Sequence, residues 1–141
     1  MSVVVDASIA VKWVIAEEGH LESLELSRAQ PLVAPDLVLV EAANVLWKKV
    51  RLRQLSAEQA RQGLGFIREA YAELVSLPEL IQRALDISLA IDHPVYDCVY
   101  LACAEREQLE LFTADKRLAV KVAGDKGHRV TLLTLNQNRT S

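Results

Sequence analysis

Glycine, proline and cysteine are all scarce in this sequence of 141 residues. Five Gly and four Pro exclude a collagen-like or low-complexity chain, and 51% hydrophobic residues exclude a disordered one. The two cysteines, Cys98 and Cys103, form no C-x-x-C motif and would lie on different faces of a helix, so we expect both to be small core residues. We therefore expect one globular domain over residues 1–135 and a loose polar tail over residues 136–141.

Long hydrophobic runs are absent as well. A charged residue interrupts each apolar stretch within about a dozen positions, whereas a membrane span needs about 20 apolar residues. The N-terminus lacks the basic region of a signal peptide and carries a carboxylate at Asp6. The sequence thus predicts a cytoplasmic protein without a membrane segment.

The chain also has no excess of basic residues. It has 16 Lys and Arg residues against 19 Asp and Glu residues, which gives a net charge of -3. The overall charge therefore does not indicate a nucleic-acid partner, and any anionic substrate must be bound by local cations.

Short apolar runs alternate with helical patterns along the chain. Strands are expected at residues 3–5, 32–33, 74–77, 111–113 and 130–133. Helices are expected between them: from residue 7 through 14, at 20–29, from 36 through 50, from 57 to about 72, from 78 to about 91, from 94 through 103 and from 116 to 123, with a turn at 124–127. This alternation predicts an α/β fold with a mainly parallel central sheet flanked by helices. In such sheets, ligands bind beyond the carboxyl ends of the strands.

Four carboxylates interrupt apolar runs. They are Asp6, Glu41, Asp97 and Asp115. Burying one unpaired, ionised carboxylate costs several kcal/mol, on the order of the net stability of a domain, so four such placements require compensation. A hard divalent cation compensates them if they converge, and oxygen ligands select Mg²⁺ or Mn²⁺. Zinc would require His or Cys ligands, and the three histidines are far apart in the sequence.

Taken singly, these carboxylates also have simpler explanations. Asp6 and Asp115 each follow an expected strand, and either could cap the helix that comes next. Asp97 lies in the first turn after Pro94, where an acidic side chain complements the helix dipole.

Glu41 is different, because it lies two turns into its helix, too deep for a cap. Its simpler alternative is a buried ion pair. Asn44 and Lys48 share its helical face and could support it as an amide and a cation, and an ordinary surface pair between Glu41 and Lys48 also fits the spacing.

A basic cluster follows on the same helix. It consists of Lys48, Lys49, Arg51 and Arg53. Cations commonly stabilise a helix C-terminus, and here they also form a candidate phosphate-binding patch beside the acidic residues. The chain contains no G-x-x-x-x-G-K-[ST], G-x-S-x-G or H-E-x-x-H motif, so nucleotide cradling, serine hydrolysis and zinc hydrolysis lack support.

Four segments in a fixed order carry a resemblance to a known family. They are Val3-Val-Val-Asp6-Ala-Ser8, Glu41-Ala-Ala-Asn44-Val-Leu-Trp-Lys48, Tyr96-Asp97-Cys-Val-Tyr100-Leu-Ala102 and Thr113-Ala-Asp115-Lys-Arg-Leu118. Together they resemble the PIN-domain ribonucleases, and specifically the VapC class of toxins from toxin–antitoxin pairs. The resemblance covers nearly the whole chain and implies a PIN-like three-layer fold.

The resemblance also implies a site and its partners. It assigns the binding of one or two Mg²⁺ or Mn²⁺ ions to Asp6, Glu41, Asp97 and Asp115, with Ser8, Asn44 and Thr113 as polar neighbours. It implies an RNA substrate cut to leave 3′-hydroxyl and 5′-phosphate ends, a homodimer, and a VapB-type antitoxin peptide lying across the cleft. Many relatives carry a further acid after the last motif, but residues 116–124 contain none, so the number of metal ions stays open.

The carboxylates and the resemblance agree on metal-assisted phosphodiester hydrolysis. Four ionised carboxylates carry a charge of -4, so one divalent ion leaves -2 and two leave zero, and RNA is repelled when no metal is bound. Two alternatives stay open: a PIN-like module that binds RNA or a partner without cleavage, and a phosphate-transferring enzyme with Asp6 as its nucleophile. The second is disfavoured because Ser8 stands where such enzymes usually place a second Asp.

Overall fold

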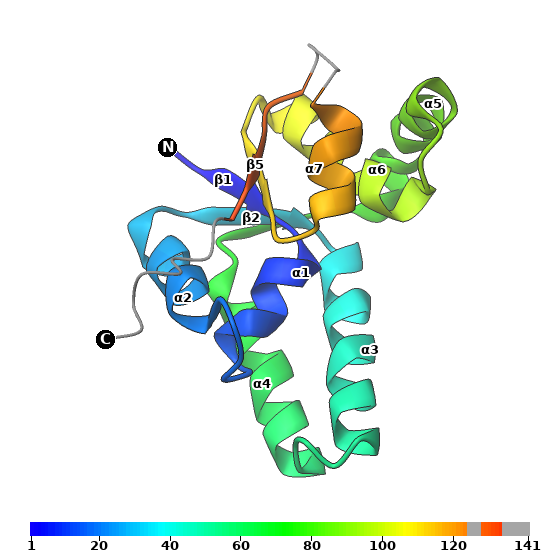
Figure 1. Ribbon diagram of the computed structural model, residues 1–141. Helices are drawn as coiled ribbons and strands as arrows, with labels where there is room; N and C mark the ends of the chain where they lie inside the picture. The colour runs from blue at the N-terminus through cyan, green and yellow to red at the C-terminus, as the bar shows by residue number, and fades with distance from the viewer. Residues whose placement is uncertain (124–127, 134–141) are drawn as a thin grey trace.

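Five short strands form one parallel sheet in the computed structural model of the chain, which describes residues 1–123 and 128–133 (Figure 1). The strands are β1 (Val3–Val5), β2 (Leu32–Pro35), β3 (Glu73–Val75), β4 (Leu111–Thr113) and β5 (Val130–Leu132). Their order across the sheet is β3-β2-β1-β4-β5, and every neighbouring pair is parallel. The predicted α/β fold with a parallel sheet is confirmed. The expected turn at residues 124–127 and the tail at 136–141 lie outside the described residues.

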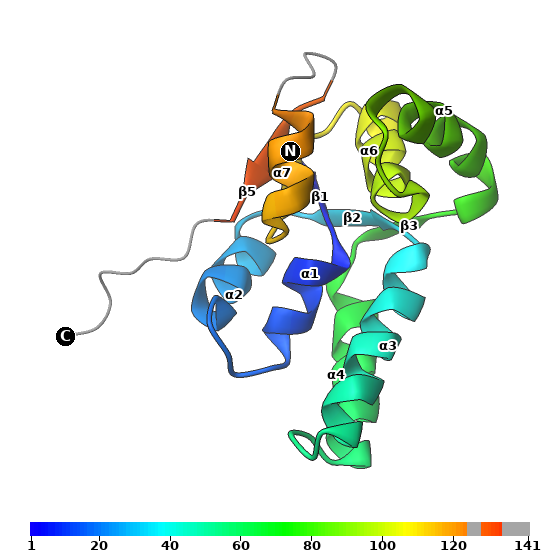
Figure 2. The ribbon, with the colours of Figure 1, turned by 45° about the vertical axis from the view of Figure 1, so that its right-hand side comes forward.

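Helices cover both faces of this sheet. They are α1 (Ala7–Ala10), the 3₁₀ turn η1 (Val11–Trp13), α2 (His20–Ala29), α3 (Leu37–Arg51), α4 (Ala57–Ala70), the 3₁₀ turn η2 (Leu77–Glu79), α5 (Ile81–Ile91), α6 (Val95–Glu107) and α7 (Lys116–Val122). Figures 1 and 2 show α1 to α4 on one side of the sheet and α5 to α7 on the other, so the sheet is the middle of three layers. Within the described part of the chain, no helix has both the length and the apolar character needed to cross a membrane.

Element boundaries follow local hydrogen bonds that the sequence pattern only partly indicates. A capping box begins α4, because Ser56 Oγ accepts from Gln59 N at 3.0 Å and Gln59 Oε1 accepts from Ser56 N at 2.8 Å. The strand expected at residues 74–77 is observed as β3, which begins at Glu73 and ends at Val75. Leu77 leaves the sheet because its N–H donates to Asp36 Oδ1 at 3.1 Å, and Pro78 then lies in η2 ahead of α5.

Helix α6 is the centre of the core. Seven consecutive residues, from Cys98 to Ala104, are buried, because α6 packs against β1, β2 and β4 on one side and α5 on the other. Both cysteines are therefore buried and free, as the sequence predicts.

The topology explains where a site can form. The chain passes from β1 to β2 and β3 on one side, and then crosses through α5 and α6 to β4 and β5 on the other. The strand order thus reverses between β1 and β4, which is where parallel α/β sheets bind their ligands. Asp6 directly follows β1, and Asp115 follows β4 by two residues.

Candidate active site

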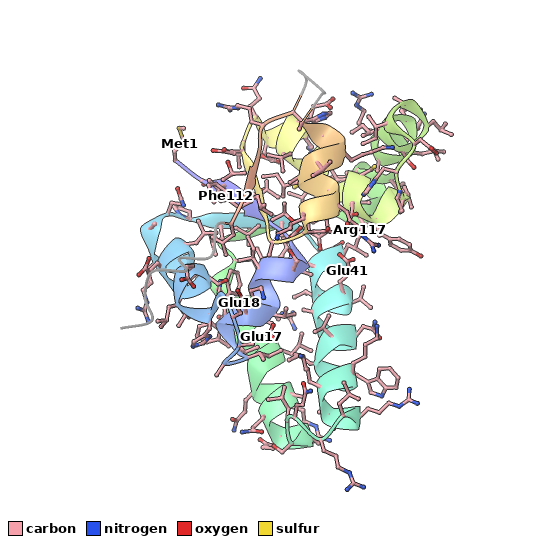
Figure 3. The ribbon with its side chains drawn as sticks, viewed as in Figure 1. Met1, Glu17, Glu18, Glu41, Phe112 and Arg117 are labelled. Carbon is pink, nitrogen blue, oxygen red and sulfur yellow. The ribbon has the colours of Figure 1, made fainter. Side chains whose placement is uncertain are left out.

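A pocket of about 280 Å³ opens at the point where the strand order reverses. Its lining residues are Asp6, Ala7, Ser8, Glu41, Asn44, Val45, Asp97, Tyr100 and Asp115. We call it the carboxylate pocket, because the structure brings all four carboxylates singled out in the sequence to its wall. Figure 3 shows Glu41 near the end of α3 that adjoins the sheet and Arg117 at the start of α7.

Asp6 lies at the bottom of the site and is only 5% exposed. Its carboxylate caps α1, accepting from Ile9 N at 3.4 Å, as the capping alternative predicts. Ser8 Oγ donates to its Oδ1 and Thr113 Oγ1 donates to its Oδ2, both at 2.5 Å. Burial raises the pKa of Asp6 from 3.8 to about 6, even though these hydrogen bonds lower it. Asp6 is therefore both a helix cap and a carboxylate at the pocket whose charged form is disfavoured by burial.

Ser8 and Thr113 donate to Asp6 because backbone amides fix their own orientation. Ser8 Oγ accepts from Ala114 N at 2.9 Å, and Thr113 Oγ1 accepts from Asp115 N at 2.9 Å. A hydroxyl that accepts from an amide directs its proton elsewhere, and here both protons point at Asp6. The start of α1 and the end of β4 are thus joined through one carboxylate.

Glu41 is held by a partner that lies 59 positions away and that no sequence pattern indicates. Tyr100 Oη donates to Glu41 Oε1 at 2.5 Å. Burial raises the pKa of Glu41, the Tyr100 hydrogen bond lowers it, and the nearby charge of Asp97 raises it again. Both residues of the suggested Glu41–Lys48 pair are described, and no ion pair joins them, so that alternative is wrong.

Asp97 lies in the first turn of α6, as expected from the position of Pro94. Its Oδ2 accepts a hydrogen bond from His93 Nε2 at 2.6 Å. The three histidines are far apart in the sequence, which argued against zinc, but the separation of four residues between His93 and Asp97 was a signal for a local pair.

Asp115 caps α7, because its Oδ1 accepts from Arg117 N at 2.9 Å. Asn44, one turn after Glu41 on α3, also lines the pocket. The remaining predicted neighbour, Thr113, is fully buried and reaches the pocket only through Asp6 and Ser8.

The basic cluster divides into side chains with different surroundings. Lys49 Nζ pairs with Glu17 Oε2 at 3.3 Å, and the Arg51 guanidinium lies over the Trp47 ring at 5.6 Å. Lys48 is exposed, and within residues 1–123 and 128–133 it forms no ion pair. The four cations predicted together are therefore not equivalent.

The chemistry of the donors fits a hard divalent cation. The acidic groups offer only oxygen atoms, which suits Mg²⁺ or Mn²⁺ better than zinc. Among the described residues, no three Asp, Glu, His or Cys side chains stand close enough to share one ion. Mg²⁺ tolerates this arrangement, because it usually keeps several waters and binds through one or two carboxylates together with substrate phosphates.

Comparison with known proteins agrees with this fold. The PIN domain model matches residues 3–124, and the chain belongs to the PIN-domain family. It is 36% identical over 124 residues to Ribonuclease VapC3 of Pyrobaculum aerophilum, covering 86% of this chain and 95% of that protein, which places it with the VapC proteins. PIN-domain nucleases depend on metal ions as a class.

Two further comparisons differ in what they show. The chain is 29% identical over 101 residues to Exonuclease VapC9 of the same organism, covering 70% of this chain and 73% of that protein. A toxin–antitoxin complex from Klebsiella pneumoniae contains a chain of the same fold, with a TM-score of 0.65 and 18% identity over 95% of this chain and 99% of that one.

Proposed function

We propose that this chain is the toxin of a type II toxin–antitoxin pair and acts as a Mg²⁺- or Mn²⁺-dependent endoribonuclease. The observation that carries the proposal is the convergence of four carboxylates from four separate segments on one pocket at the carboxyl edge of the sheet. Uncompensated, that much negative charge is costly, and a divalent cation compensates it.

In this proposal Asp6, Glu41, Asp97 and Asp115 hold the ion, directly or through water. A divalent cation, when bound, makes a nearby water more acidic and neutralises charge on the phosphate. The protein itself supplies orientation. Ser8 and Thr113 fix both oxygens of Asp6, and Asn44 offers an amide to the substrate or to a water.

Local cations support binding of an RNA backbone. Lys48 lies one turn beyond Asn44 on α3, while Lys116 and Arg117 directly follow Asp115 at the start of α7. All three side chains are exposed. They place positive charge beside the pocket on two helices, which offsets the net charge of -3 where an RNA strand would enter.

An antitoxin of the VapB type is the proposed partner. Among the described residues that line the carboxylate pocket, none is basic, so an arginine from a partner peptide would find only acidic and neutral groups there. An arginine would also exclude the metal, because its positive charge would take the place of the cation among the carboxylates. A structure of the pair in which the antitoxin leaves this pocket empty would contradict this assignment.

A homodimer is the proposed assembly. Ile81, Leu85 and Leu89 lie four residues apart on α5 and are all exposed. Residues with this spacing form one stripe along a helix. An exposed apolar stripe of this kind favours burial against a second copy.

The experiment is cleavage of a circular RNA, which has no ends for an exonuclease. Purified protein should open the circle with Mg²⁺ or Mn²⁺ and leave 5′-phosphate and 3′-hydroxyl ends, because water attacks the phosphorus and the RNA 2′-hydroxyl takes no part. Asp6→Asn should abolish the cleavage.

Other outcomes identify the alternatives. RNA binding without cleavage under any metal would indicate the binding module, and phosphate covalently attached to Asp6 would indicate the phosphate-transferring enzyme. Full activity in excess EDTA, or 2′,3′-cyclic phosphate ends, would contradict the mechanism. Degradation of linear RNA alone would replace the endonuclease with an exonuclease.

A further inference from the structure

Two ring side chains each occupy one oxygen of a pocket carboxylate. Tyr100 Oη donates to Glu41 Oε1 at 2.5 Å, and His93 Nε2 lies 2.6 Å from Asp97 Oδ2. An ionised carboxylate can only accept, so His93 is the donor in its pair. Both donors belong to the segment that carries Asp97: His93 precedes it by four residues, and Tyr100 follows it by three.

Tyr100 is placed by the core rather than by the site. Its side chain is only 1% exposed, on the helix that packs against β1 and β2, and yet its hydroxyl reaches the carboxylate pocket. Its ring therefore cannot turn without disturbing the core, whereas Glu41 has three rotatable side-chain bonds. Through this hydrogen bond, the rigid Tyr100 ring fixes the position of the flexible Glu41 side chain.

His93 is placed by the connection between α5 and α6. Its carbonyl oxygen accepts from Ser88 Oγ and, at 3.8 Å, from Cys98 Sγ. The preceding residue, Asp92, adopts a left-handed conformation with φ of 54° that ends α5. The His93 side chain is 11% exposed, so the backbone and the packing around the ring both restrict its position.

The hydrogen bonds from Tyr100 and His93 counteract repulsion between the carboxylates of the pocket. Asp6, Glu41, Asp97 and Asp115 all line one pocket, and like charges gathered in this way repel one another. Without a donor, the side chains of Glu41 and Asp97 would turn toward solvent and away from each other when no metal is bound. A donor on one oxygen keeps the carboxylate in place and leaves its second oxygen for another ligand.

We propose that Tyr100 and His93 are positioning residues that hold Glu41 and Asp97 ready for a divalent cation. The proposal rests on the metal-dependent function proposed above and adds two residues to it. Hydrogen-bond partners of metal-binding side chains typically contribute 10- to 100-fold in affinity or activity, so an effect of about tenfold is expected from each.

The test compares two tyrosines in the same core. Tyr100→Phe and Tyr71→Phe each remove one buried hydroxyl, and the Tyr71 hydroxyl donates to Val5 O at 2.7 Å instead of to a carboxylate. Both variants should lose a similar amount of thermal stability in EDTA. Only Tyr100→Phe should weaken Mn²⁺ binding, by about tenfold, measured by calorimetry and by the electron paramagnetic resonance of free Mn²⁺.

A second pair of variants tests His93 independently. His93→Leu removes the donor and should weaken Mn²⁺ binding about tenfold, whereas His93→Gln keeps a donor nitrogen and should restore most of the affinity. If Tyr100→Phe does not fold, this pair still decides the question. Equal Mn²⁺ affinities in the parent, Tyr100→Phe and His93→Leu would overturn the inference.

The two proposals fail in different ways. If Mn²⁺ does not bind the parent protein, or if Glu41→Gln leaves its affinity unchanged, the proposed function itself is wrong. If the parent binds Mn²⁺ and cleaves RNA while the Tyr100 and His93 variants match it, only the positioning role is wrong.

Discussion

Thr113 Oγ1 donates to Asp6 Oδ2 at 2.5 Å, although the two residues lie 107 positions apart. Asp6 follows β1 and Thr113 ends β4, so the hydrogen bond spans the point where the strand order reverses. It fixes a buried carboxylate without neutralising it. The cost of that charge determines how the metal-free protein should behave.

Asp6 should make the metal-free protein less stable as the pH rises. Its pKa in the folded protein is about 6, above its ordinary value of 3.8, so between these values the folded state keeps a proton that the unfolded chain has released. The stability due to Asp6 is therefore fully present below about pH 4 and lost as the pH rises through 6. A pKa change of this size corresponds to about 3 kcal/mol.

Asp6→Asn should remove this dependence. In EDTA at pH 7.5 the variant should unfold at higher urea than the parent, and at pH 4 the difference should disappear. Asp86→Asn, which removes an exposed carboxylate from α5, is the control. A parent protein whose stability rises between pH 4 and 6 as much as that of Asp6→Asn would contradict the assignment.

Glu41→Gln should uncouple metal binding from stability. The amide oxygen can still accept from Tyr100, and the repulsion with Asp97 is lost, so the metal-free variant should be more stable by about 0.5–2 kcal/mol. Stabilisation by Mg²⁺ and cleavage should both be lost. Melting curves with and without Mg²⁺ measure this, and Glu18→Gln is an exposed control.

The opposite result would remove Glu41 from the site. If Glu41 neutralised a buried cation, Gln would destabilise the protein by roughly 3–5 kcal/mol. A Glu41→Gln protein that melts well below the parent and gains as much from Mg²⁺ would show that its role is structural.

Neighbouring lysines of α3 should differ in their effect on RNA binding. Lys48→Gln should weaken binding of single-stranded RNA and reduce its salt dependence by about one counterion, because Lys48 is exposed beside the pocket-lining residue Asn44. Lys49→Gln removes a pair with Glu17, so its RNA affinity should change less. Filter binding in Ca²⁺ at several salt concentrations compares the two, and equal losses would show that the patch acts as a whole.

Leu85→Lys should dissociate the proposed homodimer. It places a charge in the middle of the exposed stripe on α5, where a second copy would bury it without a partner. Val120→Lys on α7 is a matched exposed site outside the stripe and should leave the assembly unchanged. Light scattering after gel filtration measures the mass, and a parent protein that is monomeric at all concentrations would exclude this interface.

The sequence by itself determined the order of the elements and the four carboxylates. Strands and helices follow from local periodicity, and a carboxylate inside an apolar run is conspicuous without any knowledge of its partners. Parallel strands also align their carboxyl ends, so Asp6 and Asp115 could be assigned to the same edge of the sheet in advance.

Only the tertiary structure decided which donor holds Glu41 and which of the lysines of α3 forms an ion pair. Tyr100 donates to Glu41, although the two residues lie 59 positions apart. Lys49 pairs with Glu17, 32 positions away, whereas Lys48 forms no pair with Glu41 within the described structure. Periodicity reports which face of a helix a residue occupies, but a hydrogen bond depends on the distance between atoms brought together by packing. That is why the acidic residues of this protein could be recognised from the sequence, while the tyrosine that holds Glu41 could not.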